Sequence, residues 1–208
     1  MIESWEGYRR IEIQGARIIV ARVCTTAEES PLLTEADHEE LATLLSPARR
    51  AQWSSCRAIL RHELGPEVAI RHAASGIPYL SGERDGSTYI SISHSSEWVA
   101  VMLSCSRCGV DIESVERNFS RVAPRYISHD ERQHLEERVG PCFEAVMWSA
   151  EEAIYKYANQ PGLDFIRDLV VVDIDPAERV LRAELYGHPT PIVHFTTFDN
   201  QILCYLAE

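Results

Sequence analysis

The sequence Gly-Val-Asp-Ile-Glu at residues 109–113 decides how the rest of the chain is interpreted. It predicts a short β-strand, in which successive side chains point to opposite faces of a sheet. Asp111 and Glu113 therefore leave one face together, and the apolar residues leave the other. Two neighbouring carboxylates repel each other unless a cation lies between them, and a hard divalent cation is the usual solution. An edge strand with a solvated acidic face would explain the same residues.

A long helix is predicted downstream of this strand, from about residue 141 to residue 157, and the sequence Asn-Gln-Pro-Gly at 159–162 marks its end. Trp148, Glu152 and Lys156 share one stripe of this helix because residues four apart are neighbours. An ordinary surface salt bridge between Glu152 and Lys156 would explain this spacing too. Lys156 is nevertheless notable, since it is the only lysine among 20 basic residues.

Upstream, the sequence Ser93-His94-Ser95 connects two predicted strands, 89–93 and 98–104, that form a hairpin. Hydroxyl and imidazole groups at the mouth of such a loop can hold phosphate oxygens. A capped turn with an exposed histidine is the alternative. On its own, neither this turn nor the acidic strand specifies a function.

The remaining elements indicate an α+β fold. A strand at 16–23 is expected to open the fold, and a helix at 35–45 starts at a capping pair, Thr34 and Asp37. A helical pattern runs from Arg117 to Val139, with Ser128 and Glu131 at capping-box spacing. The other expected elements are an arginine-rich helix at 46–64 (Arg49, Arg50, Arg57, Arg61), a strand at 68–71 and an antiparallel meander at 169–173, 179–186, 191–198 and 201–206.

Composition excludes several classes of protein. A chain of 208 residues is long enough for one or two domains with an ordinary core. A net charge of -12 argues against a nucleic-acid-binding protein, and no apolar run is long enough to span a membrane. The N-terminal sequence MIESWEGYRR lacks the basic-then-apolar order of a signal peptide, so we expect a cytoplasmic protein. Cys105 and Cys108 form a single C-x-x-C, which favours buried or turn-associated thiols over a zinc or redox site.

The order of the motifs is more informative than any one of them. Ile-Ser-His-Ser at 92–95, Gly-Val-Asp-Ile-Glu at 109–113 and Trp-Ser-Ala-Glu-Glu-Ala-Ile-Tyr-Lys at 148–156 together resemble the Sfp-type 4′-phosphopantetheinyl transferases. The arginine-rich helix and the turn Ser-Gly-Ile-Pro-Tyr-Leu at 75–80 look like upstream elements of that family. The resemblance covers roughly residues 46–165.

The resemblance implies a fold and an activity. The fold would consist of two similar α/β halves in a pseudo-twofold arrangement, here residues 1–106 and 107–208, with coenzyme A between them. The activity would be magnesium-dependent transfer of 4′-phosphopantetheine from coenzyme A to a serine of an apo acyl or peptidyl carrier protein, releasing 3′,5′-ADP. Such a holo-carrier-protein synthase would serve fatty-acid, polyketide or nonribosomal-peptide synthesis. A monomer would suffice.

The resemblance also assigns roles to residues. Asp111, Glu113 and Glu152 would bind magnesium, and Lys156 would lie near the phosphates of coenzyme A. His94, with Ser93, would hold the pyrophosphate, while Arg50 and Arg57 would hold phosphates at the nucleotide end. Glu152 or a metal-bound water would take the proton of the carrier serine. The catalytic set is therefore Glu152, Lys156 and His94.

Two departures from the family pattern leave alternatives open. Glu151 stands where the family usually has lysine, and Ile77 stands where a Gly-Lys-Pro turn is common. Both changes remove positive charge, so a degenerate relative that only binds coenzyme A or a carrier protein is possible, as is another magnesium-dependent phosphoryl enzyme. Carrier proteins of these pathways are typically acidic. A docking surface for one is predicted at Arg117, Arg121 and Arg125, for which a solvated face is the alternative.

Overall fold

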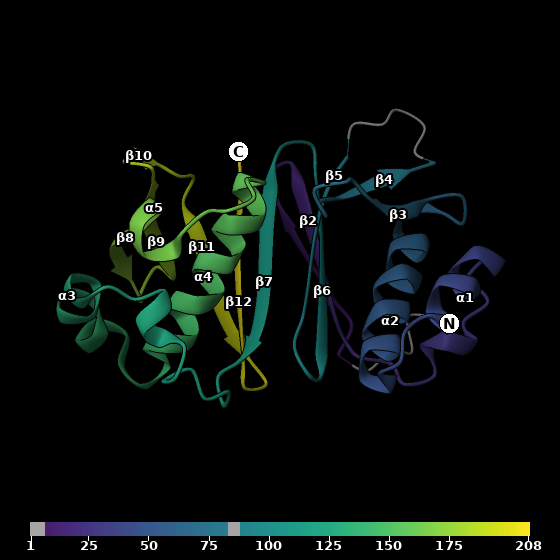
Figure 1. Cartoon of the computed structure of the whole chain (residues 1–208), viewed down its shortest axis with the longest axis horizontal. Helices are drawn as coiled ribbons and strands as arrows, with labels where there is room; N and C mark the ends of the chain where they lie inside the picture. The colour runs from purple at the N-terminus through teal and green to yellow at the C-terminus, as the bar shows by residue number, and fades with distance from the viewer. Residues whose placement is uncertain (1–6, 83–87) are drawn as a thin grey trace. The chain divides into compact units, whose positions relative to one another are not determined.

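The computed structural model describes residues 7–82 and 88–208, and the chain divides into two compact units, Met1–Ser106 and Arg107–Glu208. Each unit has an antiparallel sheet with one long helix packed against it (Figure 1). The mixed helix-and-sheet class that the order of elements predicted is confirmed. No helix within the described residues is both long and apolar enough to cross a bilayer.

The first unit is built on a four-stranded sheet in the order β1-β2-β6-β5. Its strands are β1 (Arg9–Ile13), β2 (Ala16–Arg22), β5 (Tyr89–His94) and β6 (Trp98–Ser104), with β3 (Ala69–His72) and β4 (Pro78–Ser81) as a separate hairpin. Its helices are η2 (Ala27–Glu29), α1 (Glu35–Ala42) and α2 (Pro47–Leu64). The predicted hairpin of β5 and β6 is confirmed.

The expectation that the strand at 16–23 opens the fold is wrong, because β1 precedes it. Ile13 pairs with Ala16, so only Gln14 and Gly15 connect the two strands. Gly15 has φ +73°, a conformation that tight hairpin turns require and that glycine adopts without strain. The sequence gives little signal for β1, because this five-residue strand is short, largely exposed and carries three charged side chains.

Helix α2 begins as its sequence predicts. The Ser46 hydroxyl accepts a hydrogen bond from the Arg49 N–H, and Pro47 occupies the first helical turn. Ile59 and Leu60 are buried in the core of the first unit. Burial of such a side chain stabilises the fold by about 1.5–3 kcal/mol. The core also contains Ile19, Val99, Val101 and Leu103 from the sheet, which fixes α2 against it.

The second unit has a sheet in the order β10-β9-β11-β12-β7, with β8 paired to β9. Its strands are β7 (Cys108–Ser114), β8 (Leu169–Asp175), β9 (Val180–Leu185), β10 (His188–Pro189), β11 (Val193–Phe198) and β12 (Gln201–Ala207). Its helices are η3 (Ala123–Arg125), α3 (His129–Val139), η4 (Gly140–Cys142), α4 (Phe143–Ala158) and α5 (Phe165–Asp168). The predicted antiparallel meander is confirmed.

Helix α4 packs closely against β7 and β12 (Figure 1). A Cβ atom at Gly109 would lie 1.9 Å from the backbone oxygen of Ala153, so only glycine allows this approach. The helix ends at Asn159, whose left-handed conformation (φ 55°) confirms the predicted stop. Strand β7 and helix α4 are therefore packed closely together.

The prediction of a helical pattern from Arg117 to Val139 is only partly right. The helix itself, α3, begins after Ser128, and the predicted capping box of Ser128 and Glu131 is present, as is that of Thr34 and Asp37. Before Ser128 the chain forms only a short 3-10 turn that contains Pro124. Proline cannot donate the hydrogen bond that a helix interior needs, which explains the interruption.

Candidate functional site

The two carboxylates of β7 lie on the face that α4 covers. In the register of β7 with β12, Asp111 is opposite Cys204 and Glu113 is opposite Ile202. Both of these partners belong to the core beneath α4. Since side chains opposite each other in a sheet share a face, the two carboxylates point toward the helix.

Lys156 reaches Asp111 from α4. Its ammonium lies 2.7 Å from Asp111 Oδ1 and donates a second hydrogen bond to the carbonyl oxygen of Val110, at 3.0 Å. Asp111 is almost fully buried, and the Lys156 side chain is one-quarter exposed. The salt bridge between Glu152 and Lys156 that the helix spacing allowed is absent from the described residues, where the lysine pairs with the strand instead.

Glu113 has two partners on one oxygen. Trp148 Nε1 donates to Glu113 Oε1 at 3.0 Å, and the guanidinium of Arg117 forms an ion pair with the same atom. Burial raises the pKa of Glu113, and the charge of Asp111 raises it further. The tryptophan and the arginine thus hold a carboxylate whose environment disfavours its charge.

Glu152 completes the acidic group. Burial raises the pKa of its carboxyl; the charge of Lys156 opposes this shift and that of Asp111 adds to it. Its carboxylate accepts no hydrogen bond from the residues that the structure describes. Glu152 is therefore a half-buried acid with both oxygens available.

These carboxylates fit a hard cation by chemistry but not as a preformed site. Three carboxylates from β7 and α4 offer oxygen ligands of the type that magnesium prefers. Within residues 7–82 and 88–208, however, no three acidic, histidine or cysteine side chains gather in a way that could hold a metal ion. Asp111 and Glu113 are instead neutralised by Lys156 and Arg117.

Glu151 immediately precedes Glu152 on α4 but belongs to the part of the helix that faces the core. It is fully buried, and both oxygens lack a hydrogen-bond partner among the described residues. Burial raises its pKa well above the ordinary value, and the charges of Glu131 and Glu152 raise it further. The residue that replaces the family's lysine therefore belongs to the core.

The Ser93-His94-Ser95 turn of the first unit is held by α2. Gln52 donates to the carbonyl oxygen of Ser95 at 2.9 Å, and Arg49 Nη1 lies 2.6 Å from His94 Nε2. Both serines are buried, and the Ser95 hydroxyl accepts from the Trp98 N–H. The turn thus presents an arginine and a histidine side by side.

Arg50 and Arg57 are both engaged by carboxylates. Arg50 Nε lies 3.1 Å from each oxygen of Glu28. Arg57 is buried, and it pairs with Glu40 and stacks on Trp53 with its guanidinium carbon 3.3 Å from the ring centroid. These contacts already use the two guanidinium groups.

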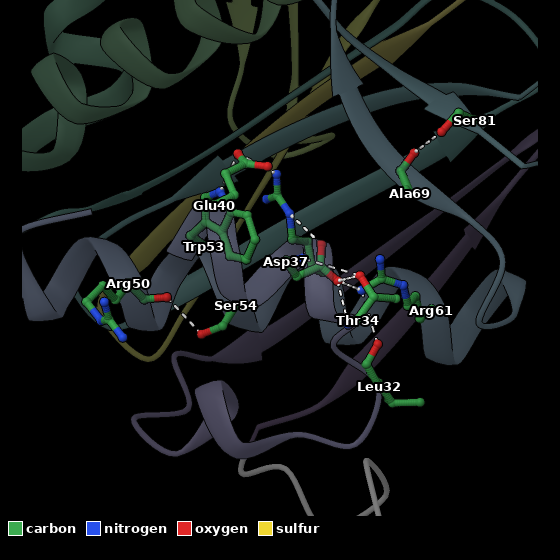
Figure 2. A network of polar contacts seen from close by, with 11 residues as sticks. Leu32, Thr34, Asp37, Glu40, Arg50, Trp53, Ser54, Arg61, Ala69 and Ser81 are labelled. Carbon is green, nitrogen blue, oxygen red and sulfur yellow. Dashed lines mark hydrogen bonds and ion pairs between the residues drawn. The ribbon is translucent and has the colours of Figure 1, made fainter. Parts of the chain in front are cut away.

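A neighbouring network fixes α1 to α2. Asp37 accepts hydrogen bonds from Thr34 and forms an ion pair with the buried Arg61, while Trp53 donates to Glu40 (Figure 2). Hydrogen bonding to Arg61 and Thr34 lowers the pKa of Asp37 against the effect of its burial. The arginines of this helix therefore serve the fold, except for Arg49, which the sequence had not distinguished.

The three arginines of the predicted docking surface differ. All three are exposed, but they do not share one helix. Arg117 and Arg121 lie in turns after β7, and Arg125 lies in η3. Arg117 is paired with Glu113, and its guanidinium lies 5.0 Å and 5.2 Å from the ring centroids of Phe119 and Trp148.

The C-x-x-C cysteines are free thiols. Cys105 is exposed and Cys108 is buried. Burial raises the pKa of Cys108 to about 12, which makes it unreactive near neutral pH.

Comparison with known proteins identifies the second unit. Residues 107–204 match the family model of the 4′-phosphopantetheinyl transferase superfamily, which confirms the resemblance inferred from the motifs. This segment contains Asp111, Glu113, Glu152 and Lys156. The chain thus carries a domain of this superfamily, whose members are transferases that move phosphopantetheine from coenzyme A to carrier proteins. No curated protein gives a significant match to the chain.

Proposed function

We propose that this protein transfers 4′-phosphopantetheine from coenzyme A to a serine of an apo acyl or peptidyl carrier protein and releases 3′,5′-ADP. The observation that carries the proposal is the contact of Asp111 with Lys156, the only ammonium side chain of the chain. This contact brings the acidic strand β7 and the lysine of α4 together within the segment that matches the superfamily.

Magnesium is the proposed cofactor, and Asp111, Glu113 and Glu152 would hold it. Its double charge would neutralise the phosphates of coenzyme A and the charge that develops on the leaving group. The carboxylates, of which Asp111 is buried and Glu113 and Glu152 are half-buried, supply suitable ligands.

The chain's own side chains supply the remaining chemistry. The serine oxygen forms a bond to the β-phosphorus while the bond from that phosphorus to the bridging oxygen breaks, and 3′,5′-ADP leaves. Lys156 donates hydrogen bonds to the phosphate oxygens and stabilises the developing charge. Glu152 would take the serine proton, for which its raised pKa is suited, through an oxygen that does not bind the metal.

The first unit would bind the phosphates of coenzyme A through the Ser93-His94-Ser95 turn. Arg49 takes the role first assigned to Arg50 and Arg57, because it contacts His94 and has no carboxylate partner within the described residues. A bidentate guanidinium beside an imidazole suits a phosphate dianion. Arg49 would also supply positive charge in the unit in which Ile77 replaces the family's usual lysine.

The proposed protein substrate is an acidic carrier, with Arg121 and Arg125 as its docking residues and Arg117 nearby. Fatty-acid, polyketide and nonribosomal-peptide systems all use such carriers. We further propose a cytoplasmic monomer in which two similar halves have a pseudo-twofold arrangement and coenzyme A binds between them.

The degenerate coenzyme-binding alternative loses part of its support. Glu151 suggested it by removing a positive charge from the cofactor region, but this residue is fully buried in the core of the second unit. An active enzyme is therefore the better proposal.

The test is the intact mass of an apo carrier protein incubated with the full chain, coenzyme A and magnesium. The carrier should gain one phosphopantetheine unit, and Asp111→Asn should abolish the gain. Asp173→Asn is the matched control, since it also removes a carboxylate of the same sheet that is paired with cationic side chains, here Arg138 and Arg182. No mass gain with carriers from all three pathways would refute transfer, and hydrolysis of coenzyme A without carrier would indicate a different phosphoryl enzyme.

A further inference from the structure

We propose that Arg117 competes with the divalent cation for Glu113, so that the cation must displace this arginine before it can bind. The inference rests on the proposed function, because it concerns the same carboxylates. It assigns Arg117 a positioning role at the metal ligands in place of the predicted role in carrier docking.

The contacts place Arg117 where a cation would bind. Its guanidinium pairs with Glu113 Oε1, the oxygen that also accepts from Trp148 Nε1 at 3.0 Å. The Glu113 side chain is 14% exposed, so this ion pair is shielded from solvent on the carboxylate side. A metal ion at the same oxygen would meet a full positive charge at hydrogen-bond distance, and the two cations would repel each other.

Arg117 is also able to leave. Its side chain is 43% exposed, and the chain turns at this point through a hydrogen bond from the Arg117 N–H to the Ser114 oxygen. Its guanidinium already contacts the rings of Phe119 and Trp148. These rings can hold the guanidinium near the site by cation–π contacts after it leaves the Glu113 carboxylate. Lys156 is held more firmly to its carboxylate than Arg117 is, because a second hydrogen bond to the Val110 carbonyl oxygen also ties it to the strand.

The competition explains how a group of carboxylates that fits magnesium chemically forms no preformed site. Each strand carboxylate is neutralised by its own cationic side chain. Neutralisation keeps the acidic group stable without metal, at the cost of a weaker affinity for the ion.

The test measures Mn²⁺ binding directly, by electron paramagnetic resonance of free Mn²⁺, on the full chain without coenzyme A or carrier. Arg117→Met keeps the side-chain stem on the aromatic rings and removes the charge. It should bind Mn²⁺ about fivefold more tightly than the unmodified protein, the size expected for loss of a partly exposed ion pair. Arg121→Met controls for the general loss of positive charge, because Arg121 is an exposed arginine four residues further along the chain. It should change the Mn²⁺ affinity less than about twofold.

Two further variants identify the cause. Arg117→Lys should return the affinity toward that of the unmodified protein, since an ammonium can also pair with Glu113. In a Glu113→Gln background, Arg117→Met should have no more effect than Arg121→Met. Equal or weaker Mn²⁺ binding by Arg117→Met would overturn the competition while leaving the metal site intact. Absence of Mn²⁺ binding in the unmodified protein and in Arg117→Met alike would overturn the metal site itself, and the competition with it.

Discussion

Replacing Glu151 should stabilise the protein, because this carboxyl lies in the core without a hydrogen bond from any described residue. A buried polar group without a partner costs about 1–3 kcal/mol. The nearby carboxylate of Glu131 cannot help, since it accepts from the N–H groups of Ser128 and Val171. Glu151→Met, which keeps the length of the side chain, should therefore gain about 1–3 kcal/mol near neutral pH.

The gain should depend on pH, with a sign that follows from the raised pKa. Between the ordinary value of 4.5 and the higher value in the folded state, the folded protein binds a proton at Glu151 that the unfolded chain lacks. The stability of the unmodified protein should therefore fall as pH rises through this window. Glu151→Gln cannot ionise, so its stability relative to the unmodified protein should rise from pH 5 to pH 8.

The assay is urea and thermal unfolding in EDTA at both pH values, so that metal binding does not contribute. A gain of 1 kcal/mol corresponds to a shift of roughly 2–4 °C in Tm. Glu137→Gln, which neutralises an exposed carboxylate on α3, is the control and should shift Tm little at either pH. The reasoning would be refuted if neither Glu151→Met nor Glu151→Gln were more stable than the unmodified protein at pH 8. It would also be refuted if the stability gain of Glu151→Gln were the same at pH 5 and pH 8.

Other predictions concern the first unit and the contact of β7 with α4. Arg49→Ala should raise the KM for coenzyme A about tenfold without changing Tm, whereas Arg50→Ala should lower Tm and leave that KM within about twofold. Gln52→Ala should raise the same KM by releasing Ser95, and Gln52→Glu, which cannot donate when ionised, should not rescue it. Gly109→Ala should lower stability by about 3 kcal/mol in urea unfolding, because its methyl group would collide with α4.

Much of the fold could be predicted because its signals are local. Ser46 and Ser128 start α2 and α3 through hydrogen bonds to backbone N–H groups three residues on, and such caps depend only on the adjacent sequence. Two short strand-like runs joined by a short link similarly predicted the hairpin of β5 and β6. Strand β1 gives a weaker local signal, because it is short and mostly charged, and it is specified by its pairing with β2.

The site was harder to predict, since it depends on helix rotation and on long-range pairs. Which arginine of α2 contacts His94 depends on how the helix packs, whereas the resemblance to the family had suggested Arg50 and Arg57 as phosphate ligands. The burial of Glu151 did have a signal, because it lies four residues after Met147 and three before Ile154, both in the core. The pairing of Arg117 with Glu113 had none, as a turn of unpredicted geometry separates them.

The single lysine has a practical consequence. An amine-directed reagent can react with only two amines of this sequence, the α-amino group and the ε-amine of Lys156. Coupling to a sensor surface through amines would therefore tether part of the protein by the group that contacts Asp111. Conversely, the extent of acylation at this one position, read by peptide mass, provides a footprint of whatever occupies the site, with no background from other lysines.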